Sequence, residues 1–126
     1  QRFAPAEQEF YVVASGDYVF AVDGTGVPLW WHHDTGVPSD AKVFDDGTVA
    51  WASGRATPNA RYVIRGLDGG LIREMRTVGT PTDGHDLQLL PNGNYMMMSY
   101  RERPGTVDLS GYGGPTDSRV LDAELQ

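Results

Sequence analysis

An internal repeat of about 45 residues is the feature that most constrains the fold. Residues 22–55 align with residues 67–101 at an offset of 45 or 46. The matches include turn, strand-end and charged positions: Asp23 falls on Asp68, Asp40 on Asp86, Gly47 on Gly93, Ser53 on Ser99 and Arg55 on Arg101. A unit of this length, repeated along one chain, predicts stacked copies of one supersecondary structure.

The repeating unit is made of short strands. Apolar runs bounded by Gly, Asp or Pro predict strands at residues 10–14, 18–22, 28–32, 41–44, 48–53, 61–66, 71–77, 86–90, 94–100 and 119–125. The pairs Asp23-Gly24, Asp46-Gly47, Asp68-Gly69 and Asn92-Gly93 are expected to supply the positive φ of tight hairpins. No stretch has a sustained helical period. The last run is interpreted as a strand because of its place in the repeat.

Four short strands in about 45 residues are typical of a β-propeller blade. With the strands of a blade labelled A to D, the chain runs B-C-D, A-B-C-D, A-B-C. We therefore predict an all-β chain of four-stranded antiparallel propeller blades that forms an incomplete ring: residues 1–36 an incomplete blade, 37–80 a full blade and 81–126 an incomplete blade. The alternative is a β-sandwich that contains two similar hairpins.

A propeller ring typically has four to eight blades, so these units do not close one. We expect the chain to be part of a longer polypeptide, or to complete its ring with another chain. Open sheet edges favour such pairing.

Composition excludes several classes of function. The 126 residues contain no cysteine, which removes disulfides, thiolate zinc sites and cysteine nucleophiles. The formal net charge is −7, which disfavours binding to nucleic acid or to an anionic membrane surface. No apolar run is long enough to span a membrane, and the first residues lack the pattern of a signal peptide.

The segment GHDLQLLPNGNYMMMSYR, residues 84–101, is the most distinctive stretch. It resembles the repeat of the aryl sulfotransferase (arylsulfate sulfotransferase) propellers, in which a His-Asp start precedes an apolar strand, a Pro-Asn-Gly-Asn turn and a strand that ends near Ser-x-Arg. The hairpin from Asp23-Gly24 to Trp30-Trp31 is similar to that family as well. The resemblance covers residues 18–126, but it is sharp only over 83–101.

The resemblance implies a function. Such a protein transfers a sulfuryl group between phenolic compounds through a histidine in the central funnel, without a nucleotide sulfate donor or other cofactor. It also implies an aromatic sulfate or phenol as the small-molecule partner and an extracellular or periplasmic location. A non-catalytic propeller module, used for binding or assembly with other chains, is the alternative.

Four residues are candidates for the site. His85 and Arg101, at the two ends of one predicted hairpin, are the candidate catalytic pair, because imidazole is a competent nucleophile and arginine binds oxyanions. Arg55, at the matching repeat position, and Tyr112, in the Gly-rich loop of residues 102–117, are candidate substrate-binding residues. His85 also fits a structural role at the start of a strand, and Arg101 a surface ion pair.

No metal site is predicted. His32 and His33 are adjacent on a strand and therefore point to opposite faces, which does not suit a shared ion. The segment Asp45-Asp46-Gly47 is better explained as a hairpin turn than as a calcium loop.

Overall fold

The computed structural model describes residues 10–55 and 57–126, and this part of the chain is all-β. The strands are β1 (Phe10–Ser15), β2 (Tyr18–Asp23), β3 (Pro28–His33), β4 (Ser39–Val43), β5 (Val49–Ser53), β6 (Arg61–Arg65), β7 (Leu71–Met75), β8 (Thr82–Leu89), β9 (Tyr95–Glu102) and β10 (Leu121–Leu125). A single 3₁₀ turn, η1 (Ser110–Tyr112), is the helical element of the described residues. The last segment is a strand, as predicted.

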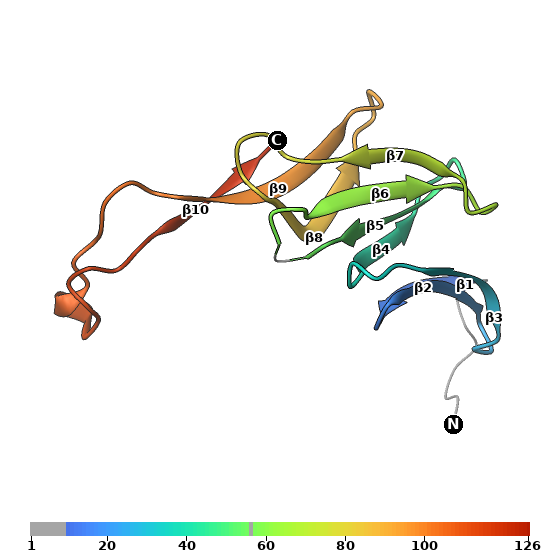
Figure 1. Cartoon of the computed structure of the whole chain (residues 1–126), viewed down its shortest axis with the longest axis horizontal. Helices are drawn as coiled ribbons and strands as arrows, with labels where there is room; N and C mark the ends of the chain where they lie inside the picture. The colour runs from blue at the N-terminus through green and yellow to red at the C-terminus, as the bar shows by residue number, and fades with distance from the viewer. Residues whose placement is uncertain (1–9, 56) are drawn as a thin grey trace.

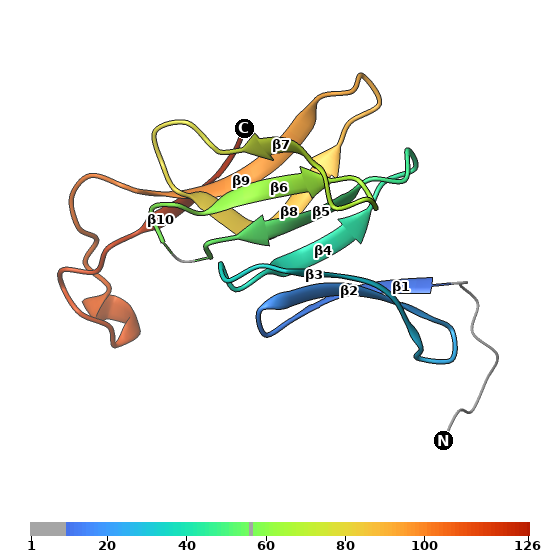
Figure 2. The ribbon, with the colours of Figure 1, turned by 45° about the vertical axis from the view of Figure 1, so that its right-hand side comes forward.

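The strands form three antiparallel sheets, shown in Figures 1 and 2. We name them blade 1 (β1-β2-β3), blade 2 (β4-β5-β6-β7) and blade 3 (β8-β9-β10). The prediction of four-stranded antiparallel blades in an incomplete ring is confirmed: blade 2 has all four strands, and the others have three. The expected boundaries after residues 36 and 80 fall in the connections between sheets. The first nine residues of the expected 1–36 blade lie outside the described residues.

Glycines with a left-handed backbone close the hairpins. Gly47, Gly69 and Gly93 have φ of 81°, 82° and 80°, as their turn pairs predict. In the first hairpin the prediction was wrong, because the positive φ lies at Gly26 (90°) and not at Gly24. The amide of Gly26 donates to the carbonyl of Asp23 at 2.9 Å, which sets the turn two residues later than the Asp-Gly pair suggests.

Blade 2 lies between the other two sheets and buries both of its faces. Strand side chains alternate between faces, and β5 illustrates this. Val49 and Trp51 pack toward blade 1, whereas Ala50 and Ala52 pack toward blade 3. The cluster between blades 1 and 2 also holds Val19 and Val63, and the cluster between blades 2 and 3 also holds Tyr62, Ile64, Leu87 and Met97.

The connection between β9 and β10 forms an arm that projects away from the sheets (Figure 1). Val107 and Ser118 pair across it, and η1 lies near its tip. Within residues 10–55 and 57–126, there is no helix with the length and apolar character needed to cross a membrane.

Candidate functional site

A groove of about 440 Å³ lies where the end of blade 2 meets blade 3. Its walls are residues that follow β5 and residues at the start of β8, with one side chain from β9. They are Arg55, Thr57, Pro58, Pro81, Thr82, Asp83, Gly84, His85 and Tyr100. Two of the four predicted site residues, Arg55 and His85, are therefore brought together.

A wide bulge in β8 places His85 at the groove. Asp83 lies opposite Met98 and Leu87 lies opposite Met97, so the three residues between Asp83 and Leu87 have no partner in β9. Bulges of this kind redirect side chains and occur often beside functional sites. The prediction that the strand opens near His85 differs from the structure, since β8 begins at Thr82 and His85 lies within it.

His85 is held by the carboxylate of Asp83. The Nδ1 atom of His85 lies 2.6 Å from Oδ1 of Asp83, and the His85 backbone amide donates to the same oxygen at 3.1 Å. A carboxylate oxygen only accepts, so this contact places the ring proton on Nδ1 and leaves the Nε2 lone pair free in the neutral imidazole. The Asp83 side chain is 15% exposed and that of His85 is 60% exposed.

Gly84 allows blade 3 to approach blade 2 at the groove. A Cβ at this position would lie 2.9 Å from Cβ of Ala52 and 4.0 Å from Cγ of Arg55. The Gly84 carbonyl accepts a hydrogen bond of 3.2 Å from Oγ of Ser39. The aliphatic stem of Arg55 thus lies beside the bulge, and Arg55 and His85 line the same groove.

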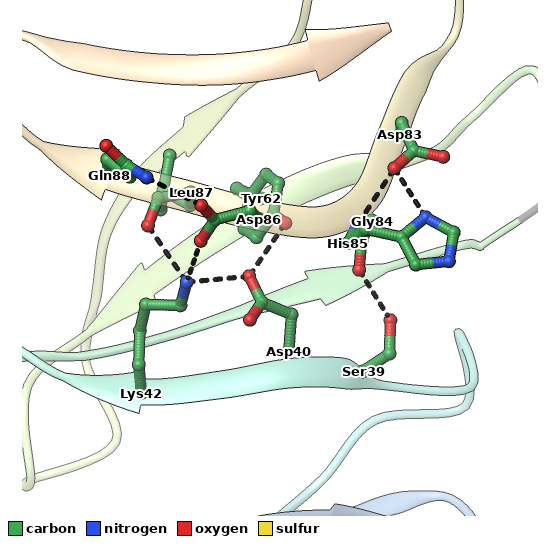
Figure 3. Close-up of polar contacts among 10 residues, drawn as sticks. All are labelled: Ser39, Asp40, Lys42, Tyr62, Asp83, Gly84, His85, Asp86, Leu87 and Gln88. Carbon is green, nitrogen blue, oxygen red and sulfur yellow. Dashed lines mark hydrogen bonds and ion pairs between the residues drawn. The ribbon is translucent and has the colours of Figure 1, made fainter. Parts of the chain in front are cut away.

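Asp86, which follows His85 in the bulge, points away from the His85 side chain and toward Lys42, as Figure 3 shows. Asp86 accepts a hydrogen bond of 2.8 Å from Nζ of Lys42, and the same ammonium group pairs with Asp40 at 2.9 Å and donates to the carbonyl of Leu87 at 2.9 Å. The hydroxyl of Tyr62 donates to Asp40 at 2.8 Å. The chain has a single lysine, and it joins the first strands of two blades.

The Lys42 cluster is electrostatically matched. Burial alone lowers the pKa of Lys42, but its hydrogen bonds to Asp40 and Asp86 outweigh burial and raise that pKa. The hydrogen bond from Lys42 is in turn the largest cause of the lowered pKa of Asp86. Burial, followed by the bond to Asp40, raises the pKa of Tyr62. This cluster therefore links blade 2 to blade 3. Its Lys42 and Tyr62 donors bind carboxylates and are not directed at the groove.

Arg101 and Tyr112 lie apart from the groove lining. Arg101 is in β9, opposite Asp122, and its Nη2 atom binds Glu124 at 3.3 Å. Tyr112 is in η1 on the arm, with 93% of its surface exposed. His85 and Arg101 do not line one groove together, because the bulge in β8 shifts the register between the two strands.

The two neighbouring histidines point to opposite faces of β3, as predicted. His32 packs between Trp30 and Trp51, with ring centroids 6.3 and 5.2 Å away. His33 lies on the other face, 4.8 Å from the ring of Tyr18. Residues 10–55 and 57–126 contain no group of three His, Asp or Glu side chains placed to hold a metal ion.

Sequence reasoning missed two functional features of this region. Asp83 was not among the candidate site residues, although an Asp two residues before a His is a signal for a local hydrogen bond. Lys42 carried a weaker signal, since its partner in blade 3, Asp86, lies 44 residues further along the chain. Comparison of the sequence with protein-family models, with curated proteins and with solved structures found no match.

Proposed function

We propose that the groove at His85 takes up a sulfuryl group from an aryl sulfate and passes it to a phenol, with His85 as the nucleophile. The observation that carries this proposal is the Asp83–His85 pair, which leaves Nε2 free in a groove that Arg55 also lines. The resemblance of residues 84–101 to the aryl sulfotransferase propellers supports the same chemistry.

Each residue has a distinct role in the proposed reaction. The Nε2 lone pair of His85 forms a bond to sulfur while the bond between sulfur and the aryl oxygen breaks, and the departing phenolate takes a proton from water. Asp83 stabilises the positive charge that the imidazole gains. Arg55 neutralises the sulfate oxygens. An acceptor phenol then bonds to sulfur, its proton passes to water, and the electron pair of the N–S bond returns to Nε2.

The walls of the groove suit an aromatic ring. Pro58, Pro81 and Tyr100 line it together with the polar groups. Aromatic and proline side chains offer flat apolar surfaces to a phenyl ring. The groove therefore has both a cationic side chain for the sulfate group and apolar side chains for the ring of an aryl sulfate.

The direct test is release of 4-nitrophenol from 4-nitrophenyl sulfate in the presence of phenol. His85→Ala is expected to abolish transfer. Asp83→Asn keeps the nucleophile but loses a charged hydrogen bond, so the rate should fall roughly 10- to 100-fold. Arg55→Ala should lower it by about 100-fold. The peptide that carries His85 should gain the mass of one sulfuryl group at neutral pH.

His33→Ala is the matched control, because His33 is an exposed histidine outside the groove. It should leave the rate unchanged. Turnover that survives in His85→Ala, or a sulfuryl group found on another residue, would show that His85 is not the nucleophile. Absence of transfer by the wild-type chain would reject the function itself.

A further inference from the structure

The outer face of blade 1, on the side away from blade 2, is apolar, and no other strand of residues 10–55 and 57–126 packs on it. Because Val12, Ala14, Val19 and Trp30 pack toward blade 2, the alternate residues of the same strands point outward. They are Tyr11, Val13, Tyr18, Phe20 and Trp31, and register places them on one side of the sheet. Trp31 is 66% exposed, and with Tyr18 and Phe20 it lines an open hollow of about 500 Å³.

The outer face of blade 3 is also apolar. Leu87 and Met97 pack against blade 2, so the alternate residues of β9 and their partners in β10 point away from it. They are Met96, Met98, Tyr100 and Glu102 of β9 and Leu121, Ala123 and Leu125 of β10, so the face is apolar except at Glu102. Leu121 and Leu125 are each 62% exposed. Among the described residues, the stack of three sheets therefore has one apolar face without a neighbouring sheet on each side (Figure 2).

The repeat indicates what covers these faces. Residues 11–16, YVVASG, match residues 49–54, VAWASG. Val13 therefore corresponds to Trp51 and Ser15 to Ser53, and both residues of blade 2 are fully buried under blade 1. The outer face of blade 1 is equivalent to a face that a preceding blade covers.

The same equivalence holds at the other end. Met96 and Met98 correspond by the repeat offset to Ala50 and Ala52, which pack against blade 3. The outer face of blade 3 is thus equivalent to a face that covers a following blade. The two exposed faces are the two halves of one kind of junction, and that junction forms twice inside this chain.

We propose that a second copy of this chain covers both faces. The outer face of blade 3 in one copy packs on the outer face of blade 1 in the other, with Met98 and Leu125 against Val13 and Tyr18. Two copies provide six blades, within the range of closed propellers, and two such contacts close the ring with twofold symmetry.

The surface area agrees with this assembly. The chain exposes 8360 Å², whereas a compact protein of its mass, 13.8 kDa, exposes about 6,600 Å². The surplus is about 1,800 Å² for each chain, of which the arm contributes a part. Two standard contacts, each burying about 800 Å² on each partner, would cover about 1,600 Å² of every chain.

The test is the mass in solution over a concentration series, measured by sedimentation velocity. The wild-type chain should reach twice 13.8 kDa. Val13→Arg and Met98→Arg each spoil one face, and because every contact uses one face of each kind, either variant alone should be monomeric. An equimolar mixture keeps one intact pair of faces and should form a dimer. Val78→Arg, at an 80% exposed loop position, is the control and should dimerise normally.

Far-UV circular dichroism checks that each variant folds, and Trp31→Glu replaces Val13→Arg if that variant does not. A dimer that survives Met98→Arg but not Val13→Arg would show a contact between two copies of blade 1, and would overturn the ring. A wild-type chain that stays monomeric would overturn the proposal too. If the two faces were then found covered in a longer polypeptide, their partners would be neighbouring blades of the same chain.

Discussion

The two junctions of this chain join equivalent sheets but are fastened by different polar groups. Between blades 1 and 2, Asp34 lies at the centre of a neutral-donor cluster: Nε1 of Trp51 donates to it at 2.6 Å, Oγ of Ser53 at 3.0 Å and the amide of Gly36 at 2.7 Å. Between blades 2 and 3, the ammonium group of Lys42 spans two carboxylates.

Both junctions therefore have a buried apolar layer, whereas the polar contacts that link the blades differ between them. Ser53 and Ser99 match in the repeat and both are fully buried, but Trp51 matches Met97, whose side chain has no N–H to donate. A carboxylate equivalent to Asp34 would lose its strongest donor there. The second junction uses Lys42 instead, which reaches Asp86 across the blades.

The largest effect is expected from Asp34→Ala. It leaves the indole N–H of Trp51 and the hydroxyl of Ser53 buried without their acceptor, which should lower the free energy of unfolding by about 3 kcal/mol. Urea denaturation followed by tryptophan fluorescence measures this. Asp46→Ala, which removes a carboxylate from an exposed hairpin turn, is the control and should cost much less than Asp34→Ala. Equal losses in the two variants would contradict the importance of the junction.

Lys42→Met should have the next largest effect. It keeps the side-chain volume but leaves Asp40 and Asp86 facing each other without a cation, so we expect a loss of about 1–2 kcal/mol. Hydrogen exchange should accelerate in β8 and remain unchanged in β3. Faster exchange in both strands would mean that the two junctions do not act separately.

A change of pH should weaken the two junctions in different pH ranges, with a smaller effect than either substitution. Burial opposes ionisation of Asp34, but the bonds from Trp51, Gly36 and Ser53 outweigh it and lower its pKa. The first junction is therefore stabilised above the ordinary Asp range and weakens as pH falls through the folded pKa. The raised pKa of Lys42 stabilises the second junction below the ordinary Lys range, and that contribution is lost as pH rises through the folded pKa.

Hydrogen exchange in β3 and β8 at acid and alkaline pH measures these losses. The second junction should also weaken in acid, since the pKa of Asp86 is lowered. Alkali should loosen β8 before β3, and the reverse order would refute the assignment. In Lys42→Met, the alkaline response of β8 should disappear.

The smallest effect is expected from Ser39→Ala. It removes one hydrogen bond of 3.2 Å to the carbonyl of Gly84, at a half-buried position, and should cost about 0.5–1 kcal/mol. Thermal unfolding detects a change of this size. Thr57→Ala, which removes a hydroxyl bonded to the carbonyl of Gly54 in an exposed loop, is a matched comparison and should cost less. A larger loss in Thr57→Ala would contradict a contribution of Ser39 to the junction.

Much of the fold could be predicted from the sequence, because its signals are local. Alternation within strands and Asp-Gly or Asn-Gly turns each depend on a few consecutive residues, and the repeat then orders the strands into blades. The exception is the first hairpin. The Asp23-Gly24 pair predicts the turn from two residues alone, but the turn begins at Asp23 and Gly26 supplies the positive φ.

The site could be predicted only in part, because it depends on register between strands. His85 and Arg55 were identified, and the groove brings them together. The pairing of His85 with Arg101 assumed an uninterrupted hairpin, which the bulge after Asp83 does not provide. The role of Lys42 depends on contacts between blades, and no local pattern reveals them.

The bulge of β8 places His85, a residue of the candidate site, in a segment that does not pair with β9. Pairing with β9 resumes at Leu87 whatever side chains lie between it and Asp83, and in β4 the matching place is a smaller irregularity between Ser39 and Lys42. Within this segment Gly84 and Asp86 hold the junction with blade 2, whereas the side chain of His85 bonds to Asp83 of its own strand and is 60% exposed. A repeated blade can therefore vary at one exposed position, as at His85, while the residues on either side of that position keep the junction.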